Sequence, residues 1–341
     1  MASDFEKIAS YGSDGSGTSN LQNPAGLATD GTFIYIAEIG NHRIAKWKLH
    51  GGSYVANIGS SGTGDNNFSS PIDIIYHKGL LYVVDSGNDR IKIHRSSDLK
   101  FITSFGTNGS GNTNFDNPLG ITTDGTYLYI TDDDNDRLVK YTLNSLKYHS
   151  KLAFADTPKL EGICFDKHEK MLYLPDKFNS EVKKIRASNL AEVDTLSISA
   201  TIFRMAGCAV KDHYLYLLNT TATGSCTLTA YDTATLTSRA TTTITKALLI
   251  SERMMIHRNI LFWTDRGNDE YHVYYTHTPV REYNTGESLA IGGNLFNNPV
   301  VAIGGKQERQ DITIGGTGVP DEIHSVEEEE PSNNYLNVEE V

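Results

Sequence analysis

A unit of about 45 residues is repeated along most of this chain. The first copy reads GSDGSGTSNLQNPAGLATDG from Gly12, followed by IYIAEIGNHRI from Ile34. In three clear copies the same proline recurs at Pro24, Pro71 and Pro118, 47 residues apart each time. A fixed period of this size is typical of propellers, solenoids and other repeat arrays, so it constrains the fold more than any single motif does.

Weaker copies follow, and two landmarks place them. An inner glycine recurs at Gly120, Gly162 and Gly207, with spacings of 42 and 45 residues. The residue that ends the second strand recurs at Asp132, Asp176, Asn219 and Asp265, with spacings of 44, 43 and 46. Six copies therefore lie between about Pro24 and Tyr275, and the fourth and fifth lack the glycine-rich loop.

Each copy predicts four strands. In the third copy they are 120–123, 127–131, 137–142 and 148–154, with Asp124-Gly125 as a hairpin turn between the first two. The strands are rich in β-branched and aromatic residues, and the third alternates polar and apolar positions. Four antiparallel strands per 40–50 residues are typical of a propeller blade. The sequence therefore predicts an all-β, six-bladed propeller.

The repeated strings resemble a known family. The pattern GxxGxGxxxFxxPxGI, followed by LYVxDxGNxRI, resembles the NHL repeat, and Asn41-His42-Arg43-Ile44 is close to the motif that names that family. The resemblance is strong over residues 5–142, weaker over 143–275 and absent after about residue 300. It implies a propeller but not one function, because NHL-type propellers include RNA binders, protein binders, lyases and lactonase relatives.

Closure of the ring needs an outer strand for the last blade. Phe5–Tyr11 aligns with outer strands of the later copies, so we expect it to complete the sixth blade. A competitor is the segment 287–293, followed by an echo of a seventh copy in 296–303. The predicted division is a propeller over residues 1–293 and an acidic, extended C-terminal arm or tail over residues 294–341.

The charge is concentrated at the C-terminus. The chain carries a net charge of −12, of which residues 306–341 contribute −8, from ten acidic and two basic residues. This segment contains too few apolar residues to fold alone, so we expect either a solvated tail or an arm that lies on a partner. Residues 1–7 show no secretory leader, which leaves the expectation of a cytoplasmic or virion-associated protein.

Polar turns are expected to share one face of the propeller. The repeated members, Asp85, Asn88, Arg90, Asp265 and Asn268, are expected to stabilise tight turns, and Phe68 and Phe115 to fill the space between blades. Departures from the repeat are better candidates for a binding face. The predicted binding-face residues are Asp132, Asp133, Asp134, Asp136, His42 and Asp89.

Metal and enzyme expectations are weaker. Asp73 stands where other copies have glycine, and Glu161 precedes Gly162, so these two acids are the candidate metal ligands in the channel. No cofactor is expected other than Ca²⁺, at this pair or at the acidic turn 132–136. The histidines are scattered and no catalytic triad is recognisable, which favours a protein that is not an enzyme. The three cysteines, Cys164, Cys208 and Cys226, are expected to be buried thiols.

Nucleic acid and membranes are not expected partners. The chain is acidic, and no apolar run is long enough for a membrane span. Lysines recur on the third strands, where we expect solvated outer faces; they are Lys46, Lys48, Lys92, Lys140, Lys183 and Lys184.

The resulting functional prediction is a non-catalytic binding or assembly module with a loop-rich face for a protein or glycan partner. Residues 306–341 are expected to mediate association into a homo- or hetero-oligomer, and a viral tail or capsid accessory is one example of such an assembly. The alternative is a metal-dependent lyase or lactonase-like hydrolase that acts in the propeller channel.

Overall fold

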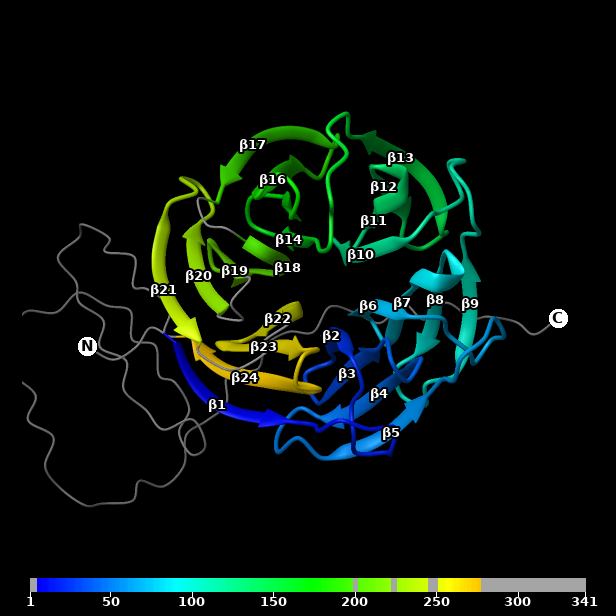
Figure 1. Cartoon of the computed structure of the whole chain (residues 1–341). Coiled ribbons are helices and arrows are strands. Elements are labelled where there is room, and N and C mark those ends of the chain that lie inside the picture. Colours follow the sequence, from blue (N-terminus) through cyan, green and yellow to red (C-terminus); the bar gives the residue numbers. More distant parts are fainter. Residues whose placement is uncertain (1–4, 199–201, 222–225, 245–250, 277–341) are drawn as a thin grey trace, which may run out of the picture. The chain divides into compact units, whose positions relative to one another are not determined.

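Six sheets, each of four antiparallel strands, make up the part of the chain that the computed structural model describes, residues 5–198, 202–221, 226–244 and 251–276. All of these residues belong to one unit, 1–282, and the second unit, 283–341, lies outside the described residues. The segment 287–303 and the predicted arm therefore lie outside them as well. Figure 1 shows the six sheets as blades around a common centre.

The strands follow the predicted repeat. The first three blades are β2 (Pro24–Thr29), β3 (Phe33–Glu38), β4 (Arg43–Lys48) and β5 (Tyr54–Ile58); β6 (Pro71–His77), β7 (Leu80–Asp85), β8 (Arg90–Arg95) and β9 (Phe101–Phe105); and β10 (Pro118–Thr123), β11 (Tyr127–Asp132), β12 (Arg137–Thr142) and β13 (Lys147–Ala153). Short 3₁₀ turns follow two of the second strands, η1 (Ser86–Asn88) and η2 (Asp133–Asn135).

The last three blades have the same order. They are β14 (Cys164–Asp166), β15 (Met171–Asp176), β16 (Glu181–Arg186) and β17 (Ala191–Ser197); β18 (Ile202–Lys211), β19 (Tyr214–Thr221), β20 (Cys226–Asp232) and β21 (Ser238–Ile244); and β22 (Ser251–His257), β23 (Ile260–Asp265), β24 (Glu270–Thr276) and β1 (Phe5–Tyr11). The first strands, β2, β6, β10, β14, β18 and β22, contact one another in a ring around the centre. The six-bladed architecture is thereby confirmed.

The ring is closed by the N-terminal strand, as predicted. β1 pairs antiparallel with β24, from Phe5 opposite Thr276 to Tyr11 opposite Tyr271. The Phe5 side chain is buried in the core between the fifth and sixth blades, and Tyr11 packs on the Tyr271 ring, with 5.3 Å between centroids. The sixth blade therefore combines strands from opposite ends of the repeat region.

Apolar clusters fill the spaces between neighbouring blades. Phe68 is fully buried in the cluster shared by the first and second blades, and Phe115 in the cluster shared by the second and third. Leu21 has the equivalent place between the sixth and first blades. The prediction that Phe68 and Phe115 fill inter-blade space is confirmed, and both faces of each sheet are covered.

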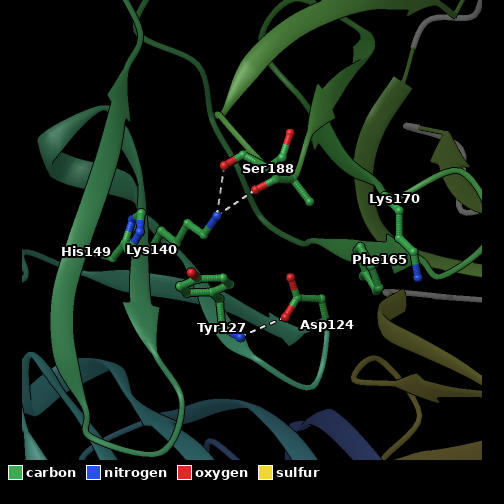
Figure 2. A pocket seen from close by; sticks show the side chains of 8 residues that line it. Asp124, Tyr127, Lys140, His149, Phe165, Lys170 and Ser188 are labelled. Carbon is green, nitrogen blue, oxygen red and sulfur yellow. Dashed lines mark hydrogen bonds between the residues drawn. The ribbon is translucent and has the colours of Figure 1, made fainter.

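This packing corrects the expectation for the third-strand lysines. Lys46, Lys92, Lys140, Lys183 and Lys184 are buried, and only Lys48 of the six is exposed. Lys140 Nζ donates to the carbonyls of Ala187 (2.8 Å) and Ser188 (3.1 Å) in the next blade, and lies 4.0 Å from the Tyr127 ring centroid (Figure 2). The alternation of polar and apolar residues does not mark a solvated face here, because a polar head can reach carbonyls of the neighbouring blade.

Candidate functional site

The loop end of the propeller is built around a repeated ion pair. In the first three blades the acid that ends the second strand binds the arginine five residues later, in the pairs Glu38–Arg43 (2.6 Å), Asp85–Arg90 (2.8 Å) and Asp132–Arg137 (2.6 Å). The same acids accept a backbone N–H from the preceding loop, as when Ser69 N donates to Asp85 Oδ1 at 2.6 Å. Burial of a carboxylate is tolerated because it is paired and hydrogen-bonded.

Each arginine also holds its glycine-rich loop. Arg137 Nη2 donates to the carbonyls of Gly111 (2.8 Å) and Asn114 (2.9 Å), and Arg43 makes the equivalent bonds in the first blade. Between acid and arginine, Asn88 Nδ2 donates to Asp85 Oδ2 (2.9 Å) and to the Gly62 carbonyl (3.0 Å). In the last blade, Asn268 Nδ2 donates to Asp265 Oδ2 at 2.8 Å. The turn-stabilising roles predicted for these repeated residues are confirmed.

His42 and Asp89 contact the neighbouring blade. Both are half-buried and adopt the left-handed conformation, with φ of 50° and 52°. His42 Nδ1 accepts the Ser70 N–H (3.0 Å), and Asp89 Oδ1 accepts the Asn117 N–H (2.8 Å), in each case from the loop that enters the next blade. These two predicted binding-face residues therefore hold adjacent blades together.

The acidic turn is mostly committed to internal contacts. Asp132 and Asp133 are buried; Asp132 pairs with Arg137, and Asp133 pairs with Lys159 and accepts the Leu160 N–H. Burial raises the pKa of both carboxyl groups, against the opposing effect of these partners. Asp134 is exposed and Asp136 half-exposed. Of the four, only these last two can contribute to a surface that a partner touches.

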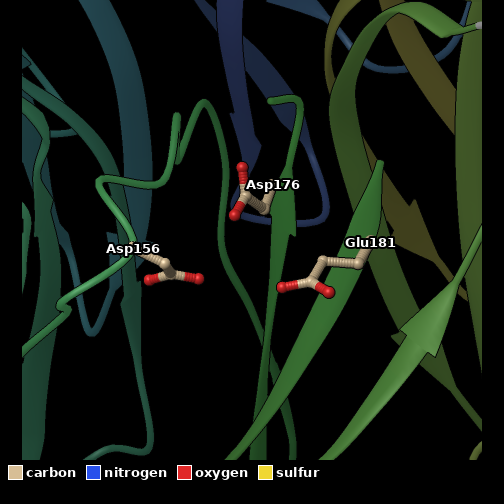
Figure 3. Close-up of side chains that lie close together, drawn as sticks. All are labelled: Asp156, Asp176 and Glu181. Atoms are coloured by element: carbon tan, nitrogen blue, oxygen red, sulfur yellow. The ribbon is translucent and has the colours of Figure 1, made fainter. Parts of the chain in front are cut away.

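The fourth blade departs from the repeat at this end. Glu181 stands where the first three blades have arginine, and Lys183 supplies the cation instead. Lys183 Nζ lies 2.7 Å from Asp156 Oδ2, 2.8 Å from Glu181 Oε1 and 4.0 Å from Asp176 Oδ2. Figure 3 shows these three acids, which form the one group of three potential metal ligands found among the described residues. The ammonium already occupies the place that a cation would take.

Replacing Lys183 with methionine should uncover a calcium site. The variant leaves Asp176 buried without its nearby ammonium, so we expect a loss of about 1–3 kcal/mol in the free energy of unfolding. Calcium should recover part of this loss, because the three carboxylates offer oxygen ligands. Thermal unfolding with and without calcium measures both effects, and Lys184→Met, whose ammonium donates to Thr233 O instead, is the matched control. Equal stabilisation of the wild-type protein by calcium would contradict the prediction.

The ion pair between Lys183 and Asp156 stabilises the protein within a defined pH range. The hydrogen bond from Lys183 lowers the pKa of Asp156 below 3.8. Burial alone would lower the pKa of Lys183, but its bonds to Asp156 and Glu181 raise it above 10.5. The pair's stabilisation is therefore lost as pH falls through the depressed carboxyl pKa, and as pH rises through the elevated ammonium pKa. The difference between wild type and the Lys183→Met variant should shrink below about pH 4.

Phe178 is an exposed aromatic residue at this end, and sequence reasoning missed it. Phe178 is 69% exposed, and the other exposed large apolar residues of the described ranges are Val55, Ile102 and Val193, on outer strands. Phe178 holds the turn position where the first two blades have Gly40 and Gly87. A Cβ at Gly40 would lie 2.6 Å from Gln22 Cγ, whereas the third blade has Asp134 at this position, with an exposed side chain. The signal was present in the sequence: an aromatic residue at a glycine position, in a copy whose loop is short.

Asp73 lies in the channel, opposite a residue that sequence reasoning missed. A cavity of about 210 Å³ is lined by first-strand residues of all six blades, including Asp73 and Arg253. Arg253 Nε lies 3.5 Å from Asp73 Oδ2, and Arg253 Nη2 donates to the Leu119 carbonyl at 2.9 Å. Burial raises the pKa of Asp73, against the opposing effect of Arg253. Asp73 and Arg253 hold the same repeat position, which is glycine in the other four blades, so the two departures form an ion pair.

The two candidate metal ligands have separate cationic neighbours. Glu161 is buried and its Oε1 lies 3.8 Å from Lys177 Nζ, whereas Asp73 faces Arg253. The group of three acids found among the described residues includes neither of them. Calcium binding at Asp73 and Glu161, or at the turn 132–136, remains a prediction.

The three cysteines are buried thiols, as predicted. Cys164 and Cys208 both line the channel cavity, on first strands of adjacent blades, and Cys208 Sγ lies 3.6 Å from the Tyr173 carbonyl. Burial and the hydrogen bond with Cys208 raise the pKa of the Cys164 thiol, which disfavours the reactive thiolate.

No helix of the described residues is long and apolar enough to cross a membrane.

A family model and one similar solved structure agree on the propeller fold. A family model described as a 6-bladed beta-propeller matches residues 61–205. In the crystal structure of the nidogen/laminin complex, a similar chain is 20% identical, with 65% of this chain and 81% of that chain covered and a TM-score of 0.55. The computationally designed Ika8 protein is 11% identical over 74% of this chain and 70% of its own, with a TM-score of 0.47. No curated protein matches the chain.

Proposed function

We propose that this six-bladed β-propeller is a non-catalytic module that binds a protein through the loop end of its fourth blade. The observation that carries the proposal is the 69% exposed ring of Phe178. Large aromatic side chains supply much of the binding energy at protein interfaces. Here the aromatic replaces a turn glycine, so the fold does not require it.

Charged groups lie at the same end of the blades as this aromatic. Lys177 precedes it, and the exposed acids Asp134 and Asp156 lie at the same end of the blades. An apolar anchor with a mixed polar surrounding is the usual composition of a protein-binding patch. The channel alternative, a metal-dependent lyase or lactonase-like hydrolase, has less support, because Asp73 and Glu161 each have a cationic neighbour.

Replacing Phe178 with serine should abolish partner binding and leave the propeller folded. The substitution removes an exposed ring, so the free energy of unfolding, followed by thermal unfolding, should change by no more than about 0.5 kcal/mol. The full-length wild-type protein and its Phe178→Ser variant can each be immobilised and exposed to extract of the source cells, with captured proteins quantified. Ile102→Ser, on an exposed outer strand, is the matched control. The same immobilised proteins can be tested on a glycan array.

The outcomes separate the candidate partners. A protein captured by wild type and by Ile102→Ser, but lost with Phe178→Ser, supports the proposal. Identical captured sets in all three would refute it. Glycan binding that depends on Phe178, without a captured protein, would replace the protein partner with a glycan.

Two finer proposals accompany this one. We infer that the blades are of the NHL type; support comes from the acid, asparagine and arginine of the quoted motif, which make the same contacts in three blades. We also infer that the acidic segment 294–341 is an assembly arm, which would make the protein a subunit of a larger assembly such as a viral tail. That segment lies outside the described residues, and its acidic composition is its only support.

A further inference from the structure

A groove lies between the third and fourth blades, at the end of the strands opposite the loop end. It encloses about 330 Å³, which is within the size range of small-molecule sites. Its lining residues are Asp124, Tyr127, Lys140, His149, Phe165, Lys170, Ala187 and Ser188. Tyr127 and His149 come from the third blade, and Phe165 and Lys170 from the fourth (Figure 2). Aromatic rings and basic groups therefore line both sides.

The repeat provides an internal reference for this groove. Ala187 N donates to the Lys170 carbonyl as Ser96 N donates to the Gly79 carbonyl, so Lys170 is equivalent to Gly79. Strand register likewise makes His149 equivalent to Val55, since each follows a tyrosine paired with the third strand. The space between the first and second blades is thus the matching position, where Phe33, Tyr76 and Ser96 stand for Tyr127, Phe165 and Ala187.

Several features of the groove are explained by folding, because both positions have them. Lys46 Nζ donates to the carbonyls of Ser96 and Ser97, as Lys140 does to Ala187 and Ser188. The tyrosine hydroxyls of the second strands likewise donate to Asp30 and Asp124, each at 2.7 Å. The lysine bonds join adjacent blades and the tyrosine bonds lie within one blade, and neither kind is specific to a ligand site.

Lys170 and His149 are not explained in this way. Lys170 is exposed, and within the described part of the chain it makes no ion pair or side-chain hydrogen bond. It adopts a φ of 58°, a conformation that glycine takes at lower cost, as Gly79 does at 82°. The exposed His149 ring packs against Tyr127, with 4.9 Å between centroids. Two basic groups have been added where the matching position has Val55 and Gly79.

We propose that this groove binds a small aromatic carboxylate, with its ring between Tyr127 and Phe165 and its carboxylate held by Lys170 and His149. The Asp124 carboxylate of the lining offsets the charge of the buried Lys140 ammonium, so Lys170 and His149 are the groups that attract the carboxylate, and such attraction is strong where water is partly excluded. The apolar walls supply the burial that an aromatic ring needs. This site is independent of the proposed protein-binding end, because it lies at the other end of the strands.

Benzoate is the direct probe. Titration into the full-length protein, followed by calorimetry or ligand-observed NMR, should show one site per chain, with no comparable binding of benzyl alcohol. Lys170→Gly and His149→Val introduce the residues of the matching position between the first and second blades and are expected to fold. Each should weaken benzoate binding by about tenfold or more, as expected for a lost charge-assisted hydrogen bond.

A gain-of-site variant provides the complementary test. Val55→His combined with Gly79→Lys should raise the benzoate stoichiometry from one to two, since a Cβ at Gly79 meets no atom within 4 Å. Unchanged benzoate affinity in Lys170→Gly and His149→Val would overturn the site, as would absence of benzoate binding. Equal binding of benzyl alcohol would overturn the role of the charge, and binding of phenyl phosphate alone would overturn the carboxylate assignment.

Discussion

Replacing Arg253 with methionine is expected to lower the free energy of unfolding by about 3–5 kcal/mol at neutral pH. The reason is the Asp73 carboxylate, which is 6% exposed and would stay in the channel without the guanidinium that lies 3.5 Å from it. The variant also loses the donor to the Leu119 carbonyl, which links the sixth blade to the third. Denaturant unfolding at equilibrium measures the change.

The pH dependence identifies the cause. Burial already raises the pKa of Asp73 in the wild-type protein, and removal of Arg253 should raise it further. A carboxyl group with a folded-state pKa above its unfolded value stabilises the fold at low pH and loses that contribution as pH rises through the folded-state pKa. The deficit of the variant should therefore be smallest in acid and should grow toward neutral pH.

A second substitution serves as the control. Asp73→Asn removes the charge but keeps an oxygen that can accept the N–H of Ile121, which bonds Asp73 Oδ2 at 3.0 Å. Combined with Arg253→Met, it should recover part of the lost stability and abolish the pH dependence of the deficit. A double variant as unstable as Arg253→Met alone would show that the ion pair is not the cause.

Deletion of residues 1–12 is expected to cost several kcal/mol. The deletion removes all pairing between β1 and β24, each backbone hydrogen bond contributing about 0.5–1.5 kcal/mol. It also removes the buried Phe5, whose burial contributes about 1.5–3 kcal/mol. The edge of β24 becomes exposed, so the truncated protein should self-associate as well as unfold at lower temperature.

Removal of residues 1–4 alone is the matched control, because it leaves β1 intact. A synthetic peptide of residues 1–12, added in excess to the truncated protein, should restore part of the melting temperature by occupying the same edge. An unchanged melting temperature after removal of residues 1–12 would mean that β1 does not close the ring.

The fold was predictable because the evidence for it is local. The turns and the β-branched strands each lie within one copy. The spacing between copies then shows that the same unit is repeated, and six copies indicate the same architecture. The closure by Phe5–Tyr11 followed from its alignment with later outer strands. The structural roles of Asp85, Asn88 and Arg90 were predictable for the same reason, since a turn is determined by neighbouring residues.

Contacts between blades were not predictable in this way. Asp73 and Arg253 are 180 residues apart, and the sixth copy is degenerate, so the shared repeat position was missed. The third-strand lysines alternate like a half-solvated strand, but Lys46, Lys140 and Lys184 bond carbonyls of the next blade, and Lys92 and Lys183 bond groups at the loop end. Phe178 and Lys170 were missed because their significance depends on what the equivalent residues of other blades contact.

The pairing of β1 with β24 also imposes a delay during biosynthesis, because the ring cannot close until the last blade has been made. β1 leaves the ribosome before the other described strands, and its partner β24 follows about 260 residues later. At roughly 5–20 residues per second, this delay is on the order of tens of seconds. During that time this seven-residue strand, which has apolar positions, lacks its partner β24. A strand of a neighbouring nascent chain could pair with it instead. The exposed charge of Lys7 within the strand opposes such mispairing until the last blade is made.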